Sequence, residues 1–256
     1  MQKLTNQIYW DRIWEELELP ILVDVENSYY GQQSDHLLKT YLDKGDKKML
    51  EVGCGTGRWL IYFHKVFGYE VYGIDNSPVA CKVSRRNLEL ANVPGSIICT
   101  DIFENRVGKE MFDVIMSSGV IEHFSQPFSV LEKMVELLKP GGKLITSVPN
   151  MDCLIRHFQK IFDREDYDRH QRISIKDLRT FYKQLDLKII EVDYYCTFNL
   201  LSINYSKFNS KAWKIMIWLL KKTNSLIIRI LRTFDSPPES RYFSPHVFAI
   251  GEKSFR

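Results

Sequence analysis

The feature of this 256-residue chain that most restricts its fold is a glycine-rich turn, "LEVGCGTG", at residues 50–57. A short apolar run leads into it, and three glycines stand at alternate positions after Glu51. Glycine adopts left-handed backbone angles freely and allows the main chain to approach a ligand closely. Such a turn between a buried strand and a helix indicates a ligand site at the first βα junction of an α/β sheet.

Two common nucleotide-binding motifs do not fit this turn. The dinucleotide pattern G-x-G-x-x-G needs a third glycine where Arg58 or Leu60 stands, depending on where the count begins. A P-loop would end in Gly-Lys-Ser/Thr, which is missing here. The stretch matches a different pattern, E/D-x-G-x-G-x-G.

The rest of the chain alternates short strand-like runs with helical stretches. We expect strands at residues 47–53, 69–75, 96–102, 112–118, 142–150, 187–195 and 246–253. Helix signals between them include Ser77-Pro78, the capping-box spacing of Ser174 and Asp177, and a terminator at Pro140-Gly141-Gly142. This alternation predicts a doubly wound α/β fold with a mainly parallel sheet and helices on both faces.

Further motifs follow the glycine turn in order: "VYGID" ending at Asp75, "TDIFE" from residue 100, "FDVIMSSGVIEHF" from 112 and "LLKPGGKLITSVPN" from 137. Over residues 47–150 the chain resembles the class I S-adenosylmethionine-dependent methyltransferases. Residues 169–195 are more weakly similar to the small-molecule and lipid methyltransferases, such as the ubiquinone-biosynthesis O-methyltransferase group. The resemblance implies a Rossmann-like, seven-stranded sheet whose last strand is antiparallel, with S-adenosylmethionine as cofactor.

The resemblance also implies a cofactor site. In it, Asp75 accepts the ribose hydroxyls, Asp101 faces the adenine amino group and Ile102 lies on the adenine ring. Glu51 orients the glycine turn or accepts from the methionine amino group. The expected set is Glu51, Gly53, Cys54, Gly55, Gly57, Asp75, Asn76, Asp101, Ile102, Ser117, Ser118 and Gly119. Taken singly, Asp75 could equally be a helix cap and Asp101 a turn residue.

Two histidines are candidates for catalysis. A base helps methyl transfer to an alcohol or phenol, because the acceptor must lose a proton, and histidine titrates in a suitable range. His123 follows the fourth expected strand, and His170 precedes the helix that begins near Ser174. The alternatives are a packing role for His123 and a loop-holding hydrogen bond from His170. We expect Glu122 to be structural or to make a weak contact.

The N-terminal stretch carries Tyr9, Trp10 and Trp14. These rings could close over the ligand as an aromatic lid. The helical spacing of Trp10, Ile13, Trp14 and Leu17 favours instead the buried face of a helix. The same stretch has no apolar core of the kind found in signal peptides.

Five scattered cysteines include no C-x-x-C pair, so the sequence predicts neither a zinc site nor a disulfide framework. We therefore expect a cytoplasmic protein with reduced thiols and no metal requirement.

Residues 196–241 form an insert before the last expected strand. From Tyr194 to Phe234 the chain has no acidic residue, and its bases are Lys207, Lys211, Lys214, Lys221, Lys222, Arg229 and Arg232. A helical wheel gathers one apolar face from Trp213, Met216, Ile217, Leu220, Ile227 and Leu231. A basic amphipathic helix fits a peripheral membrane contact through 211–232 or a cap over an apolar substrate. A lid or homodimer face is the alternative, and nucleic acid is disfavoured because no recognition motif accompanies the charge.

We expect one methyltransferase domain over residues 1–256. It comprises an N-terminal helical cap (1–46), a core with the cofactor site (47–195), the basic insert (196–241) and a final strand (242–256). The expected reaction transfers a methyl group to a small, apolar or lipid-like acceptor at oxygen. The alternatives are a sugar or protein-side-chain acceptor, and a non-catalytic cofactor-binding or scaffold protein.

Overall fold

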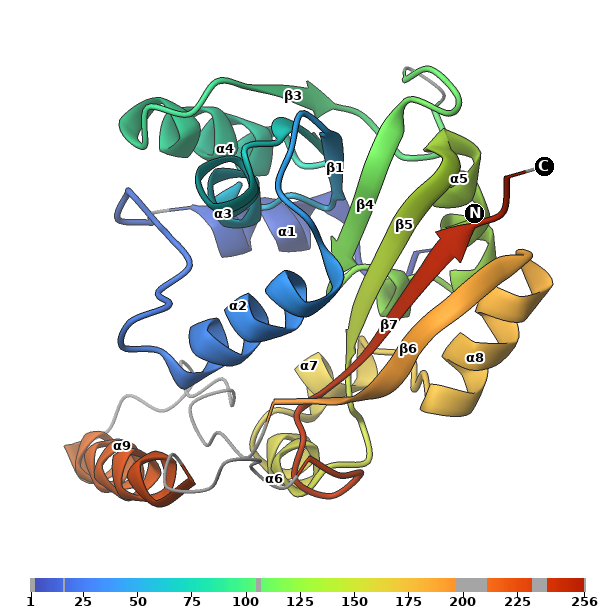
Figure 1. The fold of residues 1–256 in the computed structure, drawn as a ribbon. Coiled ribbons are helices and arrows are strands. Elements are labelled where there is room, and N and C mark those ends of the chain that lie inside the picture. The colour runs from blue at the N-terminus through green and yellow to red at the C-terminus, as the bar shows by residue number, and fades with distance from the viewer. Residues whose placement is uncertain (1–2, 16, 105–106, 197–210, 232–238, 256) are drawn as a thin grey trace.

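A computed structural model describes residues 3–15, 17–104, 107–196, 211–231 and 239–255. The chain forms a seven-stranded sheet with the strand order β3-β2-β1-β4-β5-β7-β6 (Figure 1). The strands are β1 Lys48–Val52, β2 Glu70–Asp75, β3 Gly95–Cys99, β4 Phe112–Ser118, β5 Leu138–Pro149, β6 Leu187–Tyr195 and β7 His246–Lys253. All seven strands expected from the sequence are confirmed.

The sheet is parallel except at β7. Strand β1 pairs in parallel with β2 and β4, β2 with β3, and β4 with β5. Strand β7 lies between β5 and β6 and runs antiparallel to both. The last strand is therefore antiparallel, as the resemblance implies. The parallel order reverses between β1 and β4, which places a ligand crevice at the carboxyl end of β1.

Helices cover both faces of the sheet (Figure 1). They are α1 Gln7–Trp14, α2 Tyr29–Tyr41, α3 Arg58–Phe67, α4 Pro78–Leu90, the short 3-10 helix η1 Ile121–His123, α5 Pro127–Leu137, α6 Leu154–Phe162, α7 Arg164–Asp168, α8 Ile175–Gln184 and α9 Lys211–Leu231. None of the described helices combines the length and the hydropathy that a membrane-spanning segment needs.

The core consists of two apolar layers, one on each face, because neighbouring residues of a strand point to opposite sides. Leu50 of β1 packs with residues of α5 and α8, whereas the adjacent Met49 packs with residues of α2, α3 and α4. The continuous apolar runs in the sequence arise from this two-sided burial. A sheet held from both faces gives its carboxyl edge a rigid frame for a site.

Two of the helix boundary signals work as expected. The Ser77 hydroxyl accepts a hydrogen bond from the Ala80 N–H, and Ser174 and Asp177 form a reciprocal capping box. The expected terminator at Pro140-Gly141-Gly142 stands just beyond the end of its helix, as a stop signal should, but it does not form a loop. Helix α5 ends at Leu137, and these three residues lie inside β5, where the pairing with β4 shifts register. The strand begins early because Leu138 pairs with Phe112.

Helix α9 differs from the expected wheel on its outer side. The expected apolar face includes Met216, Ile217, Leu220 and Ile227, which are half-buried, while Trp213 and Leu231 lie outside the described side chains. The outer face is apolar as well, with exposed Ile215, Trp218, Leu219, Leu226 and Ile230. Besides the expected apolar face, the described part of α9 therefore exposes apolar side chains on its outer side.

Candidate active site

A cavity of about 380 Å³ opens at the carboxyl ends of β1 and β2. Its volume falls in the range usual for small-molecule sites. The glycine turn after β1 forms its floor together with Asp75 at the end of β2 and Asp101 after β3. Gly119 and His123, which follow β4, also line it, as do Trp10 and Trp14 of the N-terminal helix. The cavity thus joins every region that the sequence singled out between residues 51 and 123.

The glycine turn requires glycine for two separate reasons. Gly53, Gly55 and Gly57 have φ angles of 72°, 51° and 71°, in the left-handed region that other residues rarely adopt. A Cβ at Gly53 would also lie 2.4 Å from Val120 Cγ2. Gly57 does not line the cavity. It precedes α3, and a Cβ there would lie 2.8 Å from Leu88 Cδ1 on α4.

Asp75 holds the glycine turn to the end of β2. Its Oδ2 accepts the Gly55 N–H at 2.9 Å, and its Oδ1 accepts the Ser77 N–H at 2.9 Å. Burial raises the pKa of Asp75, and these backbone hydrogen bonds oppose that rise. Each carboxylate oxygen has a second lone pair, so Asp75 can still accept hydroxyl groups from a ligand.

Glu51 lies beneath the turn with an unsatisfied acceptor. The residue is 4 % exposed, and its Oε2 has no hydrogen-bond partner among the described residues. Burial raises the pKa of Glu51 well above its usual value, against the opposing charge of Arg58. A buried acceptor on the cavity wall fits a ligand that brings a donor such as an ammonium group.

Asp101 is engaged by the protein itself. Its Oδ2 accepts from the ammonium of Lys3, and its Oδ1 accepts the Phe103 N–H at 3.0 Å. Lys3 was not singled out in the sequence, where nothing marks it as a neighbour of Asp101. Ile102 lines the cavity beside Asp101.

The structure brings most of the expected site residues to the cavity wall. Ser117 lies off the wall, 1 % exposed, with an Oγ that has no partner among the described residues. His170 also lies off the wall. The lining residues that the sequence did not single out include Thr5, Ile21, Trp59, Thr100, Val120 and Phe124. Of these, Thr100, Val120 and Phe124 lie within the quoted motifs, and Trp59 stands two residues after Gly57, whereas Thr5 and Ile21 had no sequence signal.

Trp10 and Trp14 of α1 line the cavity, so core packing, the favoured expectation, is wrong for these two rings, whereas Tyr9 does not line it. No described residue of α1 is fully buried, and Ile13 is 38 % exposed. The rings of Trp10 and Trp14 stack at 6.3 Å between centroids, and both line the cavity. Trp14 also lies 3.0 Å from where a Gly55 Cβ would be. These two rings cover the glycine turn from the N-terminal side.

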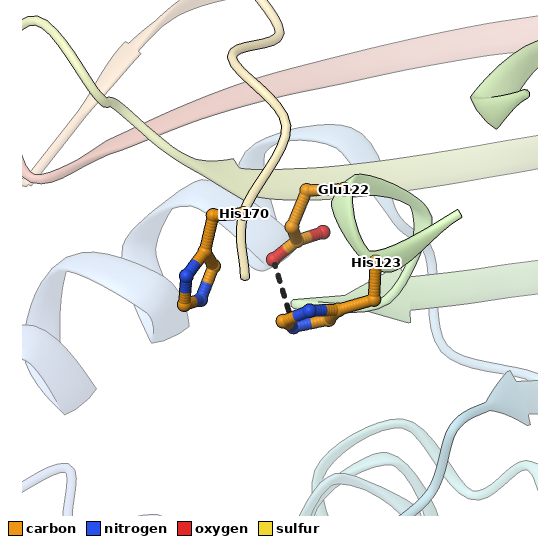
Figure 2. A group of neighbouring side chains, drawn as sticks. All are labelled: Glu122, His123 and His170. Carbon is orange, nitrogen blue, oxygen red and sulfur yellow. Dashed lines mark ion pairs between the residues drawn. The ribbon is translucent and has the colours of Figure 1, made fainter. Parts of the chain in front are cut away.

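His123, Glu122 and His170 form a cluster at the His123 end of the cavity (Figure 2). Glu122 and His123 belong to η1, and the His170 ring lies 4.6 Å from the His123 ring between centroids. The His123 Nδ1 lies 3.1 Å from the Arg169 carbonyl oxygen. Since a carbonyl only accepts, Nδ1 carries the proton in the neutral ring and Nε2 keeps its lone pair. That Nε2 lies 3.9 Å from Glu122 Oε1.

Burial dominates the electrostatics of this cluster. It lowers the pKa of His123 to about 4, with a further contribution from His170. It raises the pKa of Glu122 to about 8, against the smaller effect of Arg156. Both residues therefore lean toward their uncharged forms. Imidazole nitrogens with a carboxylate oxygen are also a set that could hold a metal ion.

The residues around the cavity fit S-adenosylmethionine. Glu51 offers a buried acceptor for the amino group, Asp75 has lone pairs to spare for the ribose hydroxyls, and the glycine turn admits a ligand against the backbone. Asp101 likewise keeps a second lone pair on each carboxylate oxygen, although its charge is already paired with that of Lys3.

Comparisons with known proteins agree with this fit. The family model described as "Methyltransferase domain" matches residues 27–192, more than half of the chain. The chain is 34% identical over 114 residues to a ribosomal protein L11 methyltransferase of Thermosipho africanus, covering 44% of this chain and 42% of the relative. It is 28% identical over 131 residues to a ubiquinone biosynthesis O-methyltransferase of Cereibacter sphaeroides, covering 51% and 53%. The chain thus spans about half the length of these curated relatives.

Solved structures share the fold. Phosphoethanolamine N-methyltransferase 2 of Haemonchus contortus, in complex with S-adenosyl-L-methionine, superposes with a TM-score of 0.61 at 18% identity, covering 88% of this chain and 53% of that one. At this identity the likeness concerns the fold alone. With the family match, the sheet order and the cavity, the conclusion is that this chain belongs to the S-adenosylmethionine-dependent methyltransferases.

Proposed function

We propose that the chain transfers a methyl group to the hydroxyl oxygen of a small, apolar acceptor. One observation carries the proposal: the glycine turn and Asp75 line one region of the cavity, and His123 lines another region of the same cavity. The first part suits the cofactor, which supplies an electrophilic methyl group when bound. The second part offers polar side chains to an acceptor held beside it.

The cofactor end of the cavity binds and orients. Asp75 holds the ribose and at the same time fixes the Gly55 backbone, so the turn and the sugar are positioned together. Trp10 and Trp14 exclude water from the glycine turn. Positioning and water exclusion are the main requirements of this displacement, because the leaving group is neutral.

The acceptor end handles a proton. A hydroxyl acceptor must lose its proton, and His123 and His170 are the titratable pair nearest to that end. Trp10 packs edge-on against His123 at 4.9 Å between centroids, which gives this end an apolar wall. These contacts support an aromatic or aliphatic alcohol over an amine or a sugar.

The decisive experiment supplies the purified protein with methyl-labelled S-adenosylmethionine and separate pools of phenols, long-chain alcohols, amines, sugars and proteins. Label in ether products of apolar hydroxyl compounds supports the proposal. Label only in amines, sugars or protein side chains would replace the acceptor class. No S-adenosylhomocysteine from any pool would point to a non-catalytic binding protein.

Two variants connect turnover to the cluster. We expect His123→Ala to lower turnover by about 10²–10⁴-fold with the affinity for S-adenosylhomocysteine nearly unchanged. His36 lies exposed on α2, away from the cavity, so His36→Ala is the matched control. Equal turnover in the two variants would remove His123 from the mechanism.

The proposal extends to location. The outer face of α9 carries the basic residues Lys222 and Arg229 beside its exposed apolar side chains, and the helix has no acidic residue. Figure 1 places α9 beyond the carboxyl end of the parallel strands, the edge at which the cavity opens. A peripheral contact with an anionic bilayer would bring that edge toward apolar acceptors. All five cysteines are free thiols, consistent with a cytoplasmic protein.

A further inference from the structure

The cluster beside the cavity has the composition of a metal site. Glu122, His123 and His170 each offer one ligand atom, and these atoms lie within 4.8 Å of one another (Figure 2). Ligands about 2.1 Å from one tetrahedral ion lie about 3.4 Å apart. The three side chains would therefore have to draw together by roughly an ångström, which is within the reach of side-chain rotation. This site was not predicted from the sequence, because His170 is far from Glu122 and His123 along the chain.

A second, independent observation comes from Glu122. The residue is 1 % exposed, and its Oε2 has no hydrogen-bond partner among the described residues. A buried carboxylate without a partner is costly unless a cation or donor satisfies it. The other carboxylate oxygen of Glu122, Oε1, lies 3.9 Å from His123 Nε2, too far for a hydrogen bond. The nitrogen and the carboxylate face each other across a gap that an ion would bridge.

The backbone around the cluster is fixed from several directions. The Leu4 N–H donates to the His123 carbonyl at 2.8 Å, and the Gln171 N–H donates to the Glu122 carbonyl at 2.8 Å. The hydrogen bond between His123 Nδ1 and the Arg169 carbonyl sets the imidazole tautomer that leaves Nε2 free to coordinate. Backbone carbonyls that orient metal-binding histidines in this way are a regular feature of metal sites.

We propose that Glu122, His123 and His170 bind a divalent first-row transition metal ion beside the cofactor cavity. Two imidazoles and one carboxylate suit such ions and leave coordination positions open. Because His123 lines the cavity, an open position can face the acceptor. An acceptor hydroxyl held there would release its proton to solvent more easily, since the ion stabilises the oxygen that remains. This last role rests on the proposed function, whereas metal binding does not.

The test measures metal binding without turnover, on untagged protein stripped with a chelator. Calorimetric titration with Zn²⁺, backed by elemental analysis after dialysis, should give about one ion per chain. Loss of a side chain that only orients a metal ligand weakens metal binding by about 10–100-fold, and loss of a ligand itself should weaken it at least as much. We therefore expect Glu122→Gln and His170→Ala to weaken Zn²⁺ binding by at least about tenfold. The matched controls are Glu132→Gln and His36→Ala, both at exposed positions, which should bind as the wild type does.

Each outcome bears on the proposal. No Zn²⁺ binding by the wild type, or equal binding by His170→Ala, would overturn it, because the ion would then be absent or held elsewhere. His170 is only partly buried, so its variant gives an answer even if Glu122→Gln fails to fold. Calorimetry with S-adenosylhomocysteine in the presence of chelator separates the two proposals. Cofactor binding without metal binding would leave the methyl-transfer proposal standing and remove the ion alone.

Discussion

Lys3 and Asp101, 98 positions apart in the sequence, form an ion pair at the wall of the cofactor cavity. Burial tends to raise the pKa of Asp101, but Lys3 and the Phe103 N–H outweigh it and lower that pKa. The carboxylate expected to face the adenine amino group is thus kept charged and already paired. We therefore expect Lys3 and the adenine amino group of the cofactor to compete for the Asp101 carboxylate.

Removing the competitor should tighten cofactor binding. Both partners are about a quarter exposed, and pairs of this kind contribute up to about 1 kcal/mol, so we expect Lys3→Ala to raise affinity for S-adenosylhomocysteine by up to about fivefold. Isothermal titration calorimetry measures this, with Lys39→Ala as the control, since Lys39 pairs with Asp35 away from the cavity. Weaker binding by the Lys3 variant would mean that Lys3 contacts the ligand.

Asp75 should have a larger effect on cofactor binding than Lys3. Replacing it with alanine should weaken S-adenosylhomocysteine binding by about 1–3 kcal/mol, because charge-assisted hydrogen bonds to the ribose would be lost. Asp75 also holds the Gly55 and Ser77 N–H groups, so the melting temperature should fall too. Asp75→Asn keeps one acceptor oxygen and should show a smaller loss of both. Unchanged affinity in the alanine variant would remove Asp75 from the site.

The glycine turn can be tested through stability alone. Gly53→Ala places a side chain at a φ of 72° and against Val120, so we expect it to lower the free energy of unfolding by at least about 1–2 kcal/mol. Gly108→Ala is the matched control, because a Cβ there meets nothing within 4 Å. Urea denaturation of both variants measures the difference. Equal stabilities would show that the turn tolerates a side chain and is not held by backbone geometry.

Much of the fold was predictable because local signals and burial agree. The apolar runs around Leu50 and Ile115 gave strands, and Ser77 gave a helix start, since each rests on neighbours in sequence. The early start of β5 was not predictable. Pro140-Gly141-Gly142 is a strong turn signal locally, but pairing of Leu138 with Phe112 across the sheet overrides it.

The site likewise has a part that was predictable from the sequence and a part that was not. The floor around Gly53, Gly55 and Asp75 was predictable because it follows a contiguous motif and a strand end. The contact of Lys3 with Asp101 and the approach of His170 to Glu122 depend on how distant segments pack. Neither pair belongs to a motif with a fixed spacing in the sequence, so these contacts could not be predicted without the three-dimensional structure.

Asp113 gives a pH-dependent prediction away from the site. Burial tends to raise its pKa, but the Lys48 N–H and the Lys139 ammonium outweigh burial and lower it. A depressed folded-state pKa stabilises the protein above the unfolded value of about 4, and that stability is lost as the pH falls through the folded value. Asp113→Asn should therefore lower the melting temperature at pH 7 by an amount that shrinks below about pH 4. Asp46→Asn, at an exposed position, should show no such trend.

The outer face of α9 predicts lipid binding. Trp218 and Leu226 are 56% and 59% exposed, and Lys222 lies over the Trp218 ring. We expect the protein to sediment with vesicles that contain phosphatidylserine. Replacing Trp218 and Leu226 with serine should weaken vesicle binding by at least about tenfold, because each apolar side chain contributes about 1.5–3 kcal/mol when fully buried. Leu90→Ser on α4 is the control. Equal sedimentation of all variants, or with neutral vesicles alone, would contradict a docking role for this face.

The position of β7 between β5 and β6 has a consequence for biosynthesis. Among the described strands, β6 pairs with β7 alone, so β6 lacks that partner while residues 246–253 are still inside the ribosome. The first five strands can assemble as they emerge, but β6 must wait for a segment translated after the whole basic insert. During that interval its unpaired edge is open to chaperones or to wrong partners.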